Sequence, residues 1–108
     1  MSDSKIVLVN DGNFRTEVLN SNTTVLVDLY ATWCGPCKML TPIMEELAND
    51  LDGQVKICKL DVDESPQVAG QYKVMSVPTI MVFRNGELLA QESGANGKLH
   101  YLSLLKSL

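Results

Sequence analysis

Residues 24–38 read TVLVDLYATWCGPCK, an apolar run that leads into two cysteines with the spacing Cys-x-x-Cys. Thr24–Tyr30 is nearly continuous in apolar and β-branched residues, which is typical of a central strand buried on both faces. Residues 36–51 then repeat apolar side chains, Met39 among them, at the three- and four-residue spacing of one buried helix face. The cysteines are therefore expected where a buried strand leads into a helix.

The rest of the chain alternates strands and helices around this unit. Further strands are predicted over residues 5–9, 55–62, 79–84 and 87–91, and further helices over residues 11–20, from Ser65 onward and over residues 97–108. Asn10 is expected to cap the first helix, and Asn85-Gly86 predicts a hairpin. This order predicts an α/β fold, a mixed sheet with helices on both faces.

Composition limits the classes of function. The 108 residues match the usual size of one domain, so we expect a single domain over residues 1–108. Nine basic residues are scattered among thirteen acidic ones, which weighs against binding to nucleic acid or to anionic membranes. The longest apolar runs are too short to span a membrane, and the first residues lack the features of a secretory signal. We expect a cytoplasmic protein, or one whose targeting segment is not part of this sequence.

The cysteines indicate either redox chemistry or metal binding. Three cysteines, an odd number, do not make a disulfide-stapled secreted scaffold. A structural zinc site needs four ligands, and beyond the pair only Cys58 and His100 remain, so we expect no metal. Lys38 stands where covalent haem attachment requires histidine. We interpret Cys58 as a small buried side chain, with a regulatory thiol as the alternative.

The position of the pair assigns different roles to its two cysteines. Cys34 is predicted at a helix N-terminus, where free N–H groups and the helix dipole favour a thiolate. We expect Cys34 to lie nearer solvent and to act as the nucleophile, and Cys37, one turn inside, to close a Cys34–Cys37 disulfide. Gly35 keeps the approach open, Pro36 stiffens the first turn, and Trp33 offers an exposed flat surface.

Asp28 is the second informative residue. Strand alternation places it on the face of Leu26 and Tyr30, inside an apolar segment. Because burial of a lone carboxylate is costly, we expect this group to be neutral over part of the working pH range. It precedes Cys34 by six residues, which would place it beneath the helix start, near Cys37. The alternative is an ordinary hydrogen-bonded aspartate at a strand end.

With these motifs in place, the chain resembles the thioredoxin family from about Lys5 to the last helix. The residues that carry the resemblance are 27–38, Pro42, 59–63, Tyr72, 77–79, Phe83, Asn85-Gly86 and Gly94. The resemblance implies a five-stranded sheet in the order 1-3-2-4-5 with four flanking helices. Tyr30 stands where many members of the family have Trp or Phe. Met75-Ser76, just before Val77-Pro78, also differs from the residues common in the family, and this difference bears on client preference.

The resemblance also implies an activity, the reduction of disulfides in oxidised client proteins. The protein would be a monomer with no bound cofactor, re-reduced by a thioredoxin reductase. Asp28 would accept the proton of Cys37, and Lys59 on the adjacent strand would tune the proton affinity of Asp28. Pro78 would be cis beside the pair, with the Val77 backbone open to a client segment.

Gly94 would belong to the same client-binding surface. Two other functions remain open at this point: an electron donor dedicated to one enzyme, and a non-enzymatic subunit of a larger assembly.

Overall fold

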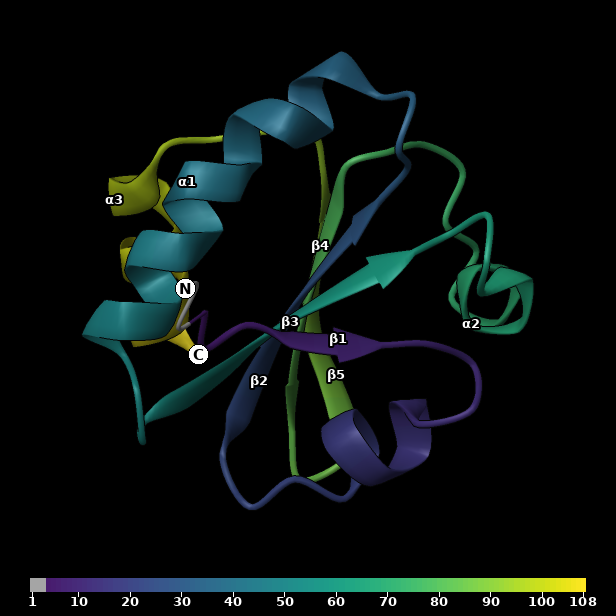
Figure 1. Ribbon diagram of the computed structural model, residues 1–108. Helices are drawn as coiled ribbons and strands as arrows, with labels where there is room; N and C mark the ends of the chain where they lie inside the picture. The colour runs from purple at the N-terminus through teal and green to yellow at the C-terminus, as the bar shows by residue number, and fades with distance from the viewer. Residues whose placement is uncertain (1–3) are drawn as a thin grey trace.

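The computed structural model describes residues 4–108, and its centre is a five-stranded sheet in the order β1-β3-β2-β4-β5 (Figure 1). Three strands are parallel, β1 (Val7–Val9), β2 (Thr24–Tyr30) and β3 (Val55–Asp61). β4 (Thr79–Arg84) is antiparallel to its neighbour β2, and β5 (Glu87–Ser93) is antiparallel to β4. β2 lies between β3 and β4, which explains why its sequence is apolar on both faces. The predicted fold class and strand order are confirmed.

Four helical segments flank the sheet: η1 (Arg15–Leu19), α1 (Gly35–Asp50), α2 (Pro66–Gln71) and α3 (Lys98–Ser107). In Figure 1, α1 and α3 cover one face of the sheet, while α2 and the short η1 helix lie on the other side. No helix within residues 4–108 is long and apolar enough to cross a membrane.

The first helix is shorter than the sequence predicts. Residues 11–20 were expected to be helical, whereas the structure has a turn followed by the single π-helical turn η1. The Asn10 side chain explains the difference, because its Oδ1 accepts hydrogen bonds from the backbone N–H groups of Gly12, at 2.8 Å, and Asn13, at 3.1 Å. These bonds fold residues 10–13 into a turn before the helix begins. Asn10 therefore closes this turn and does not cap η1, whose N-cap residue is Phe14, with no side-chain hydrogen bond.

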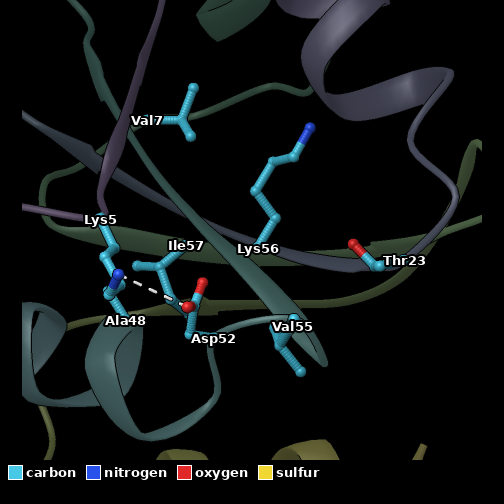
Figure 2. A pocket seen from close by; sticks show the side chains of 9 residues that line it. Lys5, Val7, Thr23, Ala48, Asp52, Val55, Lys56 and Ile57 are labelled. Atoms are coloured by element: carbon cyan, nitrogen blue, oxygen red, sulfur yellow. Dashed lines mark ion pairs between the residues drawn. The ribbon is translucent and has the colours of Figure 1, made fainter.

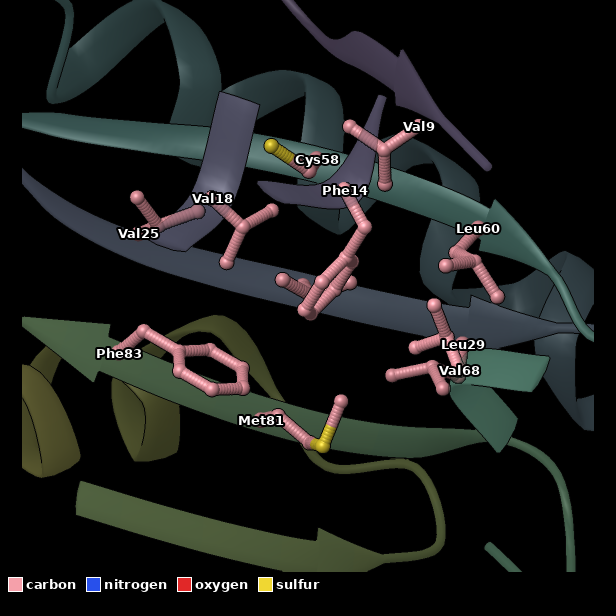
Figure 3. Packing of buried hydrophobic residues seen from close by; sticks show 11 residues of the cluster. Val9, Phe14, Val18, Val25, Leu29, Cys58, Leu60, Val68, Met81 and Phe83 are labelled. Atoms are coloured by element: carbon pink, nitrogen blue, oxygen red, sulfur yellow. The ribbon is translucent and has the colours of Figure 1, made fainter. Parts of the chain in front are cut away.

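Two apolar clusters fill the space between the sheet and its helices. On the α1 and α3 face, Leu26 packs with Leu40, Met44 and Tyr101. On the opposite face, Val27 and Leu29 belong to the cluster drawn in Figure 3, in which the labelled side chains converge between the sheet, η1 and α2. The alternation of β2 therefore divides its residues between two cores.

Met39 corrects one expectation about α1. The sequence places it on the buried helix face, but 70% of its surface is exposed. The face that is buried runs through Cys37, Leu40, Met44 and Leu47, and Met39 projects to one side of that stripe. It lines a cavity of about 410 Å³ next to Ala95, Asn96 and Gly97.

Candidate active site at the start of α1

Cys34 and Cys37 form a disulfide at the first turn of α1, with Cα atoms 5.3 Å apart. Cys34 is the N-cap residue, with extended backbone angles (φ −91°, ψ 116°), and Pro36 occupies the first turn. The backbone N–H of Cys37 donates a hydrogen bond to Cys34 Sγ, at 3.2 Å. Because the N–H groups of a first helical turn lack partners within the helix, this contact would stabilise negative charge on Cys34 Sγ once the disulfide is reduced.

The two cysteines are equally buried, contrary to the expectation that Cys34 would lie nearer solvent. Each is 4% exposed. Both belong to one buried cluster with Ala31, against which Tyr30, Val62 and Val77 pack. The space beside Gly35 is open, since a Cβ built there would meet no atom within 4 Å.

Trp33 is exposed as predicted, with 71% of its surface accessible. Its indole Nε1 donates a hydrogen bond to Asp63 Oδ2, at 2.9 Å. Sequence reasoning did not single out Asp63 as a site residue. The available signal was that parallel strands β2 and β3 end at the same edge of the sheet, so residues that follow them are brought together.

The Val77–Pro78 peptide bond is cis, as the resemblance implies. Val77 packs against the cysteine pair, which brings this segment of the chain beside the disulfide. Pro78 is buried, and its carbonyl oxygen accepts a hydrogen bond from the Gly94 N–H, at 2.9 Å. Gly94 has a φ of +92°, a backbone conformation that suits glycine. Gly94 thus anchors the proline segment from the end of β5.

A shallow groove of about 140 Å³ lies next to the pair. Met75 is 93% exposed at this groove, making it the most exposed of the large apolar side chains among residues 4–108. Five of the six residues that line the groove are apolar: Trp33, Val62, Val74, Met75 and Val77, with Ser76 as the sixth.

Asp28 is completely buried on the face of β2 that α1 covers. Within residues 4–108, neither of its carboxyl oxygens has a hydrogen-bond partner among the protein groups. Burial raises the pKa of Asp28 from 3.8 to about 6, and the positive charge of Lys59 partly opposes that rise. Lys59 is the register partner of Asp28 in the adjacent parallel strand.

Cys58 lies apart from the pair. It is fully buried in the cluster on the opposite face of the sheet, and desolvation raises the pKa of its thiol to about 12. Such a thiol is almost entirely protonated at neutral pH and therefore a poor nucleophile. In residues 4–108, no three His, Cys, Asp or Glu side chains are grouped so as to hold a metal ion.

A larger cavity of about 280 Å³ is formed elsewhere, between β1, β3 and the end of α1 (Figure 2). Lys5 Nζ and Asp52 Oδ2 form an ion pair across it, at 3.5 Å. The predicted site residues do not line this cavity. The chemistry-bearing side chains are therefore at the other end of α1.

Comparison with known proteins gives a consistent result. The thioredoxin family model matches residues 5–107. A thioredoxin of Rickettsia felis is 53% identical over 79 residues, which cover 73% of this chain and 75% of that protein. A thioredoxin of Chlorobaculum thiosulfatiphilum is 51% identical over 85 residues, 79% of each chain. A thioredoxin of Mycobacterium tuberculosis is 45% identical over 101 residues, covering 91% of this chain and 87% of the relative. With its cysteine pair joined at the start of α1, this chain belongs to the thioredoxin family of thiol-disulfide oxidoreductases.

Proposed function

We propose that the protein is a general reductase of protein disulfides, in which Cys34 attacks the client and Cys37 releases it. The observation that carries this proposal is the hydrogen bond from the Cys37 N–H to Cys34 Sγ at the helix start. It favours Cys34 as the thiolate of the reduced protein. The pair itself carries the two electrons, so the reaction needs no bound cofactor, and we propose that a thioredoxin reductase supplies them.

In the first step, the Cys34 thiolate attacks one sulfur of the client disulfide. A Cys34–client disulfide forms, the client S–S bond breaks, and the other client sulfur leaves as a thiolate. In the second step, Cys37 loses its proton and attacks Cys34 Sγ. The Cys34–Cys37 disulfide forms and the second client sulfur departs, so that the client gains the two electrons that the pair loses.

Asp28 would accept the Cys37 proton in the second step. Its pKa of about 6 makes the carboxyl group a better base than an ordinary aspartate while leaving it mostly ionised near neutral pH. Lys59, its register partner, would tune this basicity. Burial without a hydrogen-bond partner is the feature that favours a chemical role over a structural one.

The groove beside the pair would hold the client segment. Its apolar walls, which include Trp33, Met75 and Val77, suit an extended segment that carries an apolar side chain. The Val77 backbone next to the cysteines would pair with the main chain of that segment, as in strand addition. Because such pairing recognises the client's main chain and depends little on its side chains, it suits a reductase that has many clients.

The test is to trap the mixed disulfide with an oxidised model protein. In a Cys58→Ala background, which removes the third thiol, Cys37→Ser should accumulate a covalent complex with the client that a reductant dissolves. Cys34→Ser should form none and should lose catalysed reduction. Complex formation through Cys37 alone would overturn the assignment of roles.

A panel of oxidised clients distinguishes the remaining functions. A general reductase should reduce several unrelated client proteins at comparable rates, with electrons from either a small dithiol or a thioredoxin reductase. An electron donor dedicated to one enzyme should reduce a single member of the panel. A structural subunit would keep its cellular role when both Cys34 and Cys37 are replaced by serine.

A further inference from the structure

Three side chains of different chemistry meet where β2 and β3 approach the active site. Asp28 and Tyr30 are two residues apart in β2 and so share a face of the sheet. The strand register places Lys59 directly beside Asp28. The Lys59 ammonium lies over the ring of Tyr30, with Nζ 4.5 Å from the ring centroid. The cation is therefore in contact with an aromatic face next to the buried carboxyl group.

The same contact forms part of a pocket that reaches the redox pair. Tyr30, Lys59 and Cys37 all line a cavity of about 190 Å³ at the start of α1. Tyr30 also packs against the buried cluster that contains both cysteines. The Lys59–Tyr30 contact thus borders the space through which solvent approaches Cys37.

We propose that Tyr30 is a positioning residue, whose ring holds the Lys59 ammonium in the wall of this pocket and thereby fixes the positive charge that acts on Asp28. The inference rests on the proposed role of Asp28 as the proton acceptor for Cys37. A cation over an aromatic face is attracted by the ring quadrupole, and the attraction strengthens as water is excluded. Without the ring, the long lysine side chain is free to extend into solvent.

The sign of the effect follows from the groups around Asp28. Burial raises the pKa of its carboxyl group, and the Lys59 charge lowers it. Release of Lys59 should therefore raise the pKa of Asp28. Loss of the ring without any role for Lys59 would let water approach the carboxyl group and lower the pKa instead. The groups on the surrounding elements are Lys59 of β3, Tyr30 of β2, Tyr101 of α3 and the apolar Ile80 of β4. Asp61 and Glu64 add negative charge near Tyr30.

The experiment follows the Asp28 carboxyl carbon by NMR as a function of pH in the oxidised protein. Tyr30→Leu should move the titration midpoint up by roughly half a pH unit or more, since a nearby opposite charge lowers a carboxyl pKa by about 1–3. Tyr30→Phe, which keeps the ring and loses only the hydroxyl group, should titrate as the wild type does. Lys59→Met should move the midpoint up at least as far as Tyr30→Leu.

The double variant isolates the contact. If Tyr30 acts through Lys59, adding Tyr30→Leu to Lys59→Met should produce no further rise. An unchanged or lowered midpoint in Tyr30→Leu, or an equal rise in the Lys59→Met background, would overturn the inference. Tyr30 is only half-buried, and Tyr30→Val, which also removes the ring, takes the place of Tyr30→Leu if that variant folds poorly.

These outcomes are separable from failure of the proposed function, because the titration is measured without turnover. If Cys37 resolves the mixed disulfide as fast in Asp28→Asn as in the wild type, the proton-acceptor role is wrong. The effect of Tyr30 on the Asp28 titration would then remain as a measured result.

Discussion

Burial of the Asp28 carboxyl group makes the stability of the protein depend on pH. Its pKa is about 6 in the folded chain, against an ordinary value of 3.8. Below pH 3.8 the group is protonated in both states and folding carries no ionisation penalty. The penalty grows as pH rises through the window between 3.8 and about 6, because only the unfolded chain ionises easily there. Above that window the penalty is complete, about 3 kcal/mol for a difference of this size.

Asp28→Asn should therefore stabilise the protein above pH 7 and lose that advantage in acid. We expect a gain of about 1–3 kcal/mol at pH 8, since the unpartnered amide keeps part of the cost of burying a polar group. The measurement is a series of urea denaturation curves between pH 3 and pH 8. Asp52→Asn, at an exposed aspartate, is the matched control and should change stability by less than about 1 kcal/mol at either pH. A variant less stable than the wild type at pH 8 would show that the carboxyl group is not an uncompensated buried charge.

Residues whose role follows from local sequence were predictable, and those whose role depends on distant contacts were not. Cys34 and Asp28 were identified because a cysteine at a helix start and an acidic residue in a buried strand are local patterns. The Trp33–Asp63 hydrogen bond joins residues 30 positions apart and had no local signal. Equal burial of the two cysteines was missed for the same reason, since Val62 and Val77 pack against their cluster from other segments.

The same distinction applies to helices and strands. β2 and β4 have the bounds that their sequences predict, since each lies inside the sheet and is apolar along its length. β1 and β5 lie at the two edges of the sheet, and neither has the predicted bounds. β1 is shorter than predicted, Val7–Val9, and β5 extends beyond its predicted end at residue 91, to Ser93. The prediction of a helix in the segment before η1 was wrong, because the hydrogen bonds that the Asn10 side chain accepts compete with a helix. Exposed or edge elements depend more on such local competition than buried ones do.

The β4–β5 hairpin offers a test of how tightly one turn is fitted to the rest of the fold. Asn85 and Gly86 both have positive φ, 53° and 78°, as a two-residue turn of this type requires. A Cβ at Gly86 would lie 3.1 Å from the carbonyl oxygen of Leu19, which ends η1. Gly86→Ala should therefore destabilise the fold for two reasons. Alanine in the left-handed conformation costs about 1–2 kcal/mol, and its Cβ would crowd the Leu19 carbonyl oxygen.

Gly53→Ala is the matched control for that substitution. Gly53 has a similar φ of +83°, but a Cβ there would meet no atom within 4 Å. In urea denaturation we expect Gly86→Ala to lose more stability than Gly53→Ala, the difference being the contact with Leu19. Equal losses in the two variants would mean that the hairpin moves away from η1 without cost.

The active site exists only when several segments of the chain meet at one edge of the sheet. The cysteines follow β2, Asp63 follows β3, Val77-Pro78 precedes β4, and Gly94 follows β5. Parallel strands β2 and β3 end at this edge, and antiparallel β4 begins there, so the topology alone brings the segments together. Periodicity predicts the strands but not their spatial order, which came from the resemblance to a family.

The disulfide should make the folded protein more stable than its dithiol form. In the chain-entropy account, closing a loop of about four residues lowers the entropy of the unfolded chain and so raises its free energy by about 2 kcal/mol. Urea denaturation at pH 7 with and without a dithiol reductant measures the difference, and the Cys34→Ser/Cys37→Ser variant should not respond to the reductant. A reduced protein of equal or greater stability would contradict this expectation. By thermodynamic linkage, a fold that favours its own disulfide makes the dithiol a better electron donor than the same pair in an unfolded chain, as the proposed reductase requires.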